Sequence, residues 1–195
     1  MAPRGHADLL LPWVQDLLAQ GGIGLSSLDA LVFGRGPGSF TSLRIGIGVT
    51  QGLAWGADIP VVPVSSLQST AQVAAESGVN LAIVALDARM SEVYAGTFKL
   101  DKNGLMQANG KEMVCSPQKL CKLESRGWFG VGNGFERYPE LAEFTESLDG
   151  VYTDIWPSAK AMIPLAQDWL KSNTALPAEK AQPVYLRDKV AEKPA

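Results

Sequence analysis

Apolar residues recur at helical spacing near the start of the chain. Leu10, Val14 and Leu17 predict a helix over residues 7–20, which the Gly21-Gly22 pair ends. Short apolar runs beyond it predict two buried strands, each followed by a helical stretch. The strands are expected at residues 28–33 and 60–65, and the helices at residues 39–55 and 66–77. This strand–helix–strand order implies parallel pairing in an α/β fold.

A strongly apolar run at residues 81–86 begins a second unit. A turn at residues 87–90 and the pattern of residues 92–100 predict a partner strand after it. The later elements are expected as a short helix at 116–123, a strand at 128–131, a glycine loop at 132–134 and a closing helix at 157–172. We therefore predict two domains, residues 1–78 and residues 79–195.

The composition is that of an ordinary globular protein with a mild acidic balance. Apolar residues make up 46% of the 195 residues, charged residues make up 19%, and the formal net charge is −3. This balance excludes a disordered chain and gives no basic footprint for direct nucleic-acid binding. No apolar run reaches the length of a membrane span, and the first residues lack the pattern of a secretion signal. We expect a cytoplasmic protein that does not contact a membrane.

Cysteine and histidine content limits the chemistry that the chain can perform. Cys115 and Cys121 are expected to be free thiols, and no cluster of cysteine and histidine predicts a metal site. His6 is the only histidine, so a Ser-His-Asp triad would depend on one residue near the N-terminus.

A glycine loop, residues 34–38, lies between a predicted strand and a predicted helix. Exposed N–H groups and the helix dipole attract phosphate at such a place. However, no lysine lies in this loop as in a P-loop, and the glycine spacing differs from that of a dinucleotide fingerprint. Ser39 and Thr41 are candidate helix caps, and no Gly-x-Ser-x-Gly motif surrounds Ser39. The loop is either a phosphate site or a tight turn into the helix.

The helix after this loop carries Gly46, Gly48 and Gly52 in its interior. Each glycine costs about 0.8–1 kcal/mol of helix stability relative to alanine, so a compensating contact is expected. Either the helix presses on its own sheet, or another subunit's helix approaches it closely.

Asp87, Arg89 and Glu92 surround the turn between the two strands of the second unit. Paired carboxylates can perform acid–base chemistry, but a local ion-paired turn explains the same residues.

The sequence contains motifs that together resemble one family. The run Gly34-Arg35-Gly36-Pro37-Gly38-Ser39-Phe40-Thr41, followed by Leu43-Arg44-Ile45-Gly46, resembles the signature of the bacterial TsaB family, also called YeaZ. Further segments match that family in the same order: Pro3-Arg4 with His6, Ala85 through Arg89 with Glu92-Val93-Tyr94, and Pro183-Val184-Tyr185-Leu186-Arg187. The resemblance covers nearly the whole chain.

This resemblance implies a two-lobed, actin-like ATPase (ASKHA) fold and a role in tRNA modification. The family supports threonylcarbamoylation of adenosine in tRNAs that read codons starting with adenine. A TsaB protein is a non-catalytic subunit that binds a TsaD-like catalytic subunit, and a TsaE-like ATPase joins the two. The resemblance further implies a homodimer in the absence of TsaD, contact with tRNA only through the complex, and no cofactor. No protease apparatus supports the older glycoprotease label.

The family's partner contact uses the first two helices, which assigns a predicted docking face to this chain. Its residues are Leu10, Val14, Leu17, Ile45, Gly48, Val49 and Gly52. The rival hypothesis is a nucleotide-binding, actin-like enzyme, and a truncated inactive paralogue is a third alternative. The nucleotide site of such an enzyme, whether active or vestigial, would consist of Gly36, Gly38, Ser39, Asp87, Gly132 and Gly134.

The chain departs from the family pattern in two places. Ser42 stands where the family usually has glycine, so an added side chain could crowd a close contact. Family members also begin with strands that precede the first helix of this chain. We therefore expect a truncated N-terminal lobe, with an exposed strand edge and low stability when alone.

Overall fold

The computed structural model describes residues 6–120 and 126–187 of the chain, and Cys121 lies outside this part. The first half contains α1 (His6–Gly21), η1 (Leu25–Ser27), β1 (Leu31–Gly36), α2 (Phe40–Ala57), β2 (Val61–Ser65), α3 (Ser66–Ala75), β3 (Leu81–Asp87) and β4 (Val93–Leu100). The second half contains β5 (Met106–Ala108), β6 (Met113–Cys115), α4 (Pro117–Leu120), β7 (Phe129–Val131), α5 (Gly134–Arg137), η2 (Pro139–Leu141), α6 (Ala142–Thr145), β8 (Gly150–Tyr152), α7 (Ala159–Ser172) and η3 (Ala178–Lys180).

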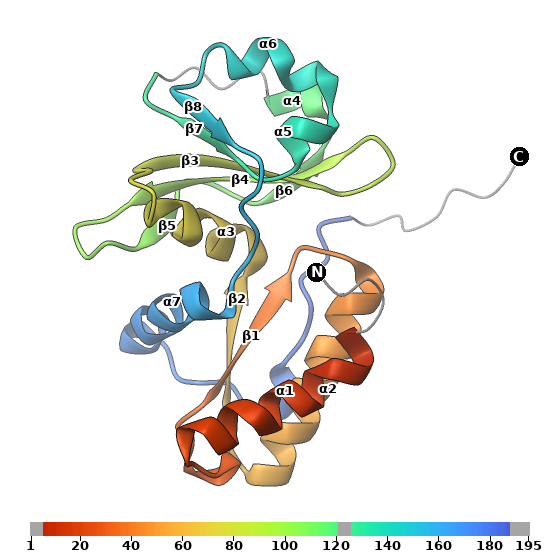
Figure 1. The fold of residues 1–195 in the computed structure, drawn as a ribbon, viewed down its shortest axis with the longest axis vertical. Helices are drawn as coiled ribbons and strands as arrows, with labels where there is room; N and C mark the ends of the chain where they lie inside the picture. Colours follow the sequence, from red (N-terminus) through yellow and green to blue (C-terminus); the bar gives the residue numbers. More distant parts are fainter. Residues whose placement is uncertain (1–5, 121–125, 188–195) are drawn as a thin grey trace, which may run out of the picture.

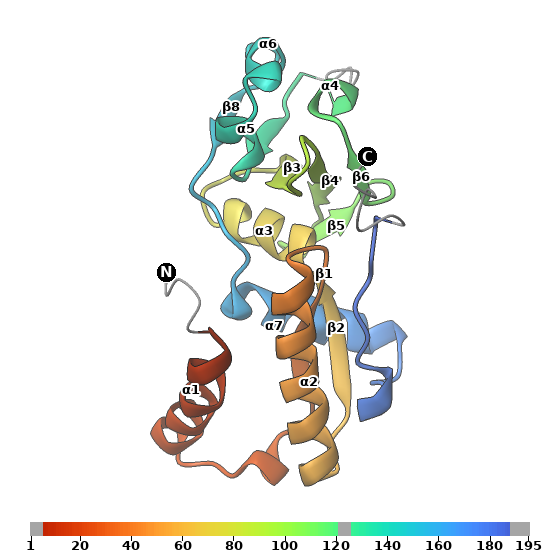
Figure 2. The ribbon, with the colours of Figure 1, turned by 90° about the vertical axis from the view of Figure 1, so that its right-hand side faces the viewer.

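The first sheet consists of β1 and β2, which pair in parallel as the strand–helix–strand order predicts (Figure 2). Successive side chains of a strand point to opposite faces, so neighbours in β2 enter different cores. Val61 packs with Ile47 and Ala54 of α2, whereas Val62 packs with Leu165 of α7. The two helices therefore cover opposite faces of this sheet.

The second sheet has the order β5-β4-β3-β7-β8, and β6 also pairs with β4 (Figure 1). The β3–β4 pair is antiparallel, whereas β7 pairs in parallel with both β3 and β8. Ala82 and Val84 of β3 pack with Leu67 of α3 on one face. Ile83 and Ala85 point to the other face, where the short helices α4 to α6 cover them.

The predicted elements are confirmed in kind, but their ends move. The first strand begins at Leu31, not at residue 28, and continues through Gly36, so the glycine loop is shorter than predicted. Ser39 is the N-cap of α2, but its side chain makes no capping hydrogen bond. Gly134 begins α5 and is not part of a loop. The helix α1 continues through Pro12 without a break.

The two sheets are joined by elements that cross between them. Helix α3 packs on the second sheet and contacts α7, which packs on the first. Glu112, before β6, accepts a hydrogen bond from Ser65 at the end of β2 and forms an ion pair with Arg35 of β1 at 3.3 Å. This packing crosses the division at residue 78, which stays a prediction.

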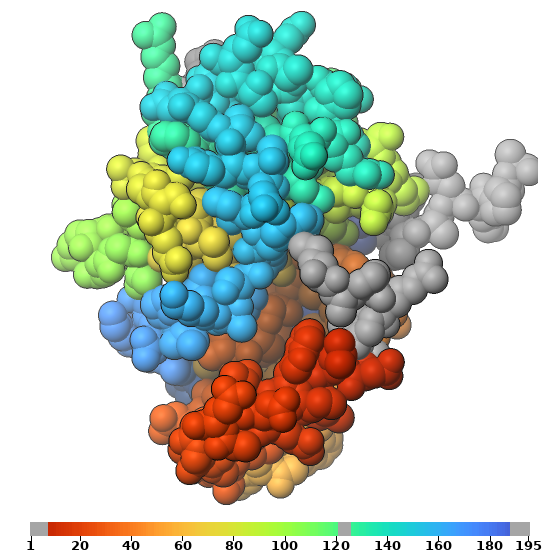
Figure 3. Space-filling model, viewed as in Figure 1, coloured from red at the N-terminus to blue at the C-terminus, as the bar shows by residue number. Residues whose placement is uncertain are grey.

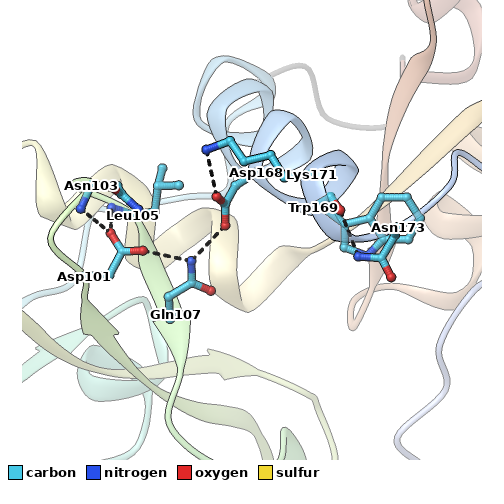
Figure 4. A network of polar contacts seen from close by, with 8 residues as sticks. All are labelled: Asp101, Asn103, Leu105, Gln107, Asp168, Trp169, Lys171 and Asn173. Carbon is cyan, nitrogen blue, oxygen red and sulfur yellow. Dashed lines mark hydrogen bonds and ion pairs between the residues drawn. The ribbon is translucent and has the colours of Figure 1, made fainter.

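A second polar network links the turn before β5 to α7 (Figure 4). The side-chain amide of Gln107 donates to Asp101 and to Asp168, at 3.2 Å in both cases. Asp168 also accepts from Lys171 at 3.1 Å. Backbone N–H groups of Asn103 and Leu105 bond to Asp101 and hold its pKa below the ordinary value, with the Leu105 bond the largest cause.

Candidate functional site

A cavity of about 690 Å³ lies between the two sheets, where the chain leaves β1 and β3. Its walls come from the start of α2, the turn after β3, the segment before α7 and the C-terminal segment (residues 182–187). The lining combines aromatic rings with a few polar groups: Phe40, Tyr94, Trp156 and Tyr185 with Ser39, Asp87, Arg89, Asn133 and Arg187. Such a mixture of apolar walls and convergent polar groups is typical of a ligand site.

Asp87 lies at the end of β3, and its carboxylate is surrounded by donors. One oxygen accepts from the Tyr138 hydroxyl at 2.6 Å and from the Arg89 backbone N–H at 2.8 Å. The other oxygen forms ion pairs with Arg137 at 3.0 Å and with Arg89 at 3.3 Å. Only 7% of the Asp87 side chain is exposed, so these contacts fill most of its hydrogen-bonding capacity.

The surroundings of Asp87 act on its pKa in opposite directions. Burial tends to raise the pKa, because it disfavours the charged form. The Tyr138 hydrogen bond, the Arg89 N–H bond and the charges of Arg137 and Arg89 together outweigh burial and hold the pKa below its ordinary value. Asp87 is therefore ionised at neutral pH, and the same hydrogen bond contributes to a raised Tyr138 pKa after burial of the phenol.

Replacing Asp87 with asparagine is expected to destabilise the protein by about 2 kcal/mol at pH 7, because hydrogen bonds to a charged group are lost. The exposed arginines contribute little to this figure. A depressed folded-state pKa adds stability above the unfolded pKa, and that contribution is lost as pH falls through the folded pKa. The difference between the two proteins should thus shrink below about pH 4 in urea titrations. A difference that stays constant from pH 7 to pH 2.5 would contradict this assignment.

The structure brings some of the predicted nucleotide-site residues together and separates others. Gly38 and Ser39 line the cavity opposite Asp87. Gly36 is buried within β1 and does not line the cavity. Gly132 and Gly134 lie beside the Ala85 carbonyl, where a Cβ atom would come within 2.6 Å and 2.8 Å of its oxygen.

The turn residues Asp87, Arg89 and Glu92 are only partly a local ion-paired unit. Arg89 pairs with Asp87, as predicted, but Glu92 pairs with Arg187 from the C-terminal segment. Within residues 6–120 and 126–187, no group of three or more His, Cys, Asp or Glu side chains could hold a metal ion. Cys115 is a buried free thiol, and burial raises its pKa.

A second candidate site is the predicted docking face on α1 and α2. The two helices contact each other, and α1 lies on the surface of the molecule (Figure 3). Leu17 is 67% exposed, and Gly48 and Gly52 are also exposed. The remaining predicted residues are half-buried: Leu10, Val14, Ile45 and Val49.

The glycines of α2 explain how this face could receive another helix. A Cβ built on Gly46, Gly48 or Gly52 would have no atom within 4 Å, apart from the helix's own backbone. The helix packs on its own sheet through Ile47 and Ala54, and none of these three glycines lies in that contact. Gly48 and Gly52 are four residues apart and exposed, so they share one side of α2 and leave it free of side chains where a partner helix can approach closely.

Sequence reasoning missed several residues at both sites. Trp55 is 75% exposed at the end of α2, and Trp13 is half exposed on α1. Trp55 follows Gly52 by three residues, and Trp13 follows Leu10 by three. This helical spacing could have placed both tryptophans beside the predicted docking residues. Tyr185 and Arg187 also line the cavity. Their place there could not be predicted, because they lie far in the sequence from the other lining residues.

Across the described ranges, no helix is long and apolar enough to cross a membrane.

Comparison with known proteins places this mixed α/β chain in the class of TsaD-like domains, which have an actin-like ATPase fold. A family model described as "TsaD: tRNA N6-adenosine threonylcarbamoyltransferase" matches residues 1–195. Within this class, curated relatives carry the name tRNA threonylcarbamoyladenosine biosynthesis protein TsaB. The Escherichia coli protein is 39% identical, covering 99% of this chain and 85% of that protein. The Haemophilus influenzae protein is 40% identical, covering 99% and 84%.

Solved structures agree with these relatives. A structure described as YeaZ from Pseudomonas aeruginosa superposes with a TM-score of 0.83 at 39% identity, covering 95% of this chain and 86% of that one. Another, described as an uncharacterized protein with similarity to peptidase YEAZ, from the same organism, gives a TM-score of 0.85 at 40% identity, with the same coverage. The chain belongs to the bacterial TsaB (YeaZ) family.

Proposed function

We propose that the chain is a non-catalytic subunit in the biosynthesis of threonylcarbamoyladenosine in tRNAs that read codons starting with adenine. It docks a TsaD-like catalytic subunit through the docking face on α1 and α2. A TsaE-like ATPase joins this pair in the cytoplasm, and two copies of the chain pair when the catalytic subunit is absent. The observation that carries the proposal is the exposed surface of α2 at Gly48 and Gly52, together with the exposed Leu17 of α1.

The state of Asp87 supports an accessory role. A carboxylate that binds a metal or moves a proton needs free lone pairs. Here Tyr138, Arg137 and Arg89 occupy the carboxylate of Asp87.

We also propose that the chain consists of two lobes. Residues 1–78 form the lobe that docks the partner, and residues 79–195 form the lobe that contains the second sheet.

Size-exclusion chromatography with light scattering tests the docking role directly. The full chain is measured alone and mixed with the TsaD-like subunit of the same organism. We expect a stable one-to-one complex, because α2 offers close helix approach without rearrangement. Separate elution of the two proteins at micromolar concentration would sink the proposal.

The cavity favours a second candidate function, that of a nucleotide-binding actin-like protein. Gly38 and Ser39 face Asp87 across it, as a site between two lobes requires. Under this alternative, ATP with magnesium should raise the melting temperature in proportion to the logarithm of its concentration. Under the docking proposal, millimolar ATP with magnesium leaves the melting temperature of the isolated chain unchanged.

A further inference from the structure

The C-terminal segment lies against both the first sheet and the docking helix. The Val184 N–H donates to the Arg35 carbonyl of β1 at 2.8 Å. The Tyr185 ring stands against Phe40 of α2, with centroids 5.4 Å apart, and its hydroxyl accepts from the Arg44 Nε at 3.1 Å. Arg44 also covers the Phe40 ring at 3.8 Å from the centroid. This end of the segment is therefore fixed to α2 by a tilted aromatic pair, a hydrogen bond and a cation–π contact.

The other end of the segment binds the β3–β4 turn (residues 88–92) of the second sheet. Arg187 is only 17% exposed, and it forms an ion pair with Glu92. Its guanidinium also donates to the Arg89 carbonyl at 3.4 Å and contacts the Met90 sulfur at 3.3 Å.

The turn that Arg187 holds has an unusual backbone. Arg89, Met90 and Ser91 are consecutive residues with φ of 61°, 53° and 55°. Left-handed conformation is unfavourable for residues other than glycine, and strain of this kind persists only where surrounding contacts over-determine it. Contacts from the C-terminal segment are among those that hold this turn.

The same segment borders two cavities. Residues 184–187 form one wall of the large cavity between the sheets. Pro183 and Tyr185 also line a smaller cavity of about 350 Å³ together with Gly48 and Gln51 of α2. A partner that covers Gly48 therefore meets the C-terminal segment directly.

We propose that the C-terminal segment is a latch that couples the docking helix α2 to the β3–β4 turn and to the wall of the large cavity. When the Tyr185 end is seated on α2, Arg187 is positioned to hold the turn in its left-handed form. When the Tyr185 end leaves α2, the turn relaxes and the cavity loses that wall. Coupling within the chain stands on these contacts alone, and its use by a docking partner rests on the function proposed above.

Amide hydrogen exchange of the full chain tests the coupling. Tyr185→Ala removes the ring and hydroxyl contacts with α2 and leaves the Arg187 side chain, which contacts the turn, unchanged. We expect exchange in residues 88–92 to become at least about 5-fold faster, a typical coupling between separate sites. Arg187→Gln should give a similar increase at the turn, because it removes the other end of the latch. Arg126→Gln, at an exposed arginine outside the latch, is the matched control and should leave the turn unchanged.

Two outcomes separate coupling from general destabilisation. Strand β3 must keep its wild-type protection in each variant. If Tyr185→Ala also loses protection in β3, Arg44→Gln is used in its place. Arg44 is exposed on α2, and its substitution weakens the contacts that hold Tyr185 there. Unchanged exchange at the turn in a variant whose β3 stays protected would overturn the proposal.

The docking partner provides a second readout that is independent of the first. Binding of the TsaD-like subunit should change exchange at residues 88–92 in the wild-type chain and not in Tyr185→Ala. If no complex forms, the proposed function fails while the coupling measured in the isolated chain stands. If a complex forms and the turn is unaffected in the wild type, the link between docking and latch is wrong.

Discussion

Replacing Gly48 with leucine is expected to weaken docking of a TsaD-like subunit by roughly 10- to 100-fold or more and to leave the isolated chain folded. A leucine side chain would occupy the space that a partner helix needs, and overpacking of this kind costs about 1–3 kcal/mol or more. In the isolated chain the same side chain meets no atom within 4 Å of its Cβ. Titration calorimetry measures the affinity, and thermal unfolding measures the fold.

A smaller substitution at the same place separates stability from docking. Gly48→Ala should stabilise the isolated chain by about 0.8–1 kcal/mol, because alanine has the higher helix propensity. For a protein of this size, that corresponds to a rise in melting temperature of about 2–4 °C. Ala159→Leu, at an exposed position of α7, is the control for adding an apolar side chain to the surface. Wild-type affinity in Gly48→Leu would show that α2 is not the docking helix.

Replacing Gly132 with alanine is expected to destabilise the protein by about 3 kcal/mol, through backbone strain and overpacking together. Gly132 has a φ of 105°, which L residues rarely adopt. Its Cβ would also lie 2.6 Å from the Ala85 carbonyl oxygen, a backbone atom that cannot move without disturbing β3. Differential scanning calorimetry should show a melting temperature lowered by about 6–12 °C.

This substitution also tests why glycine is present at the end of β7. Gly48→Ala is the matched control, since it adds the same methyl group where nothing lies within 4 Å. A wild-type melting temperature in Gly132→Ala would mean that the turn can shift to admit a side chain. Glycine would then be explained better by close approach of a ligand than by packing against Ala85.

Apolar periodicity predicted the order and kind of most elements because each has a simple pattern. Strand β3 is a continuous apolar run, since α3 covers one of its faces and the short helices cover the other. The ends of elements were harder to place, because glycine and serine occur both inside and beside them. The run from Gly34 to Gly38 shows the difficulty for a strand: its first part extends β1, and only its end forms the turn.

The predicted candidate sites depended on tertiary structure to different degrees. The rival hypothesis of an actin-like nucleotide site grouped Gly38, Ser39 and Asp87, and all three line the cavity. Sequence could not reveal that Asp87 is occupied by Tyr138 and Arg137, because those residues come from a later helix and the residue after it.

By itself, the sequence determined the α/β class, the family and the unusual glycine content of α2. These follow from local patterns and motifs, which the chain carries without reference to its fold. Only the tertiary structure decided that those glycines face open space and that the C-terminal segment spans both sheets. Exposure and long-range contact depend on how distant segments pack, and neither Gly48 nor Arg187 has neighbours in sequence that specify its surroundings.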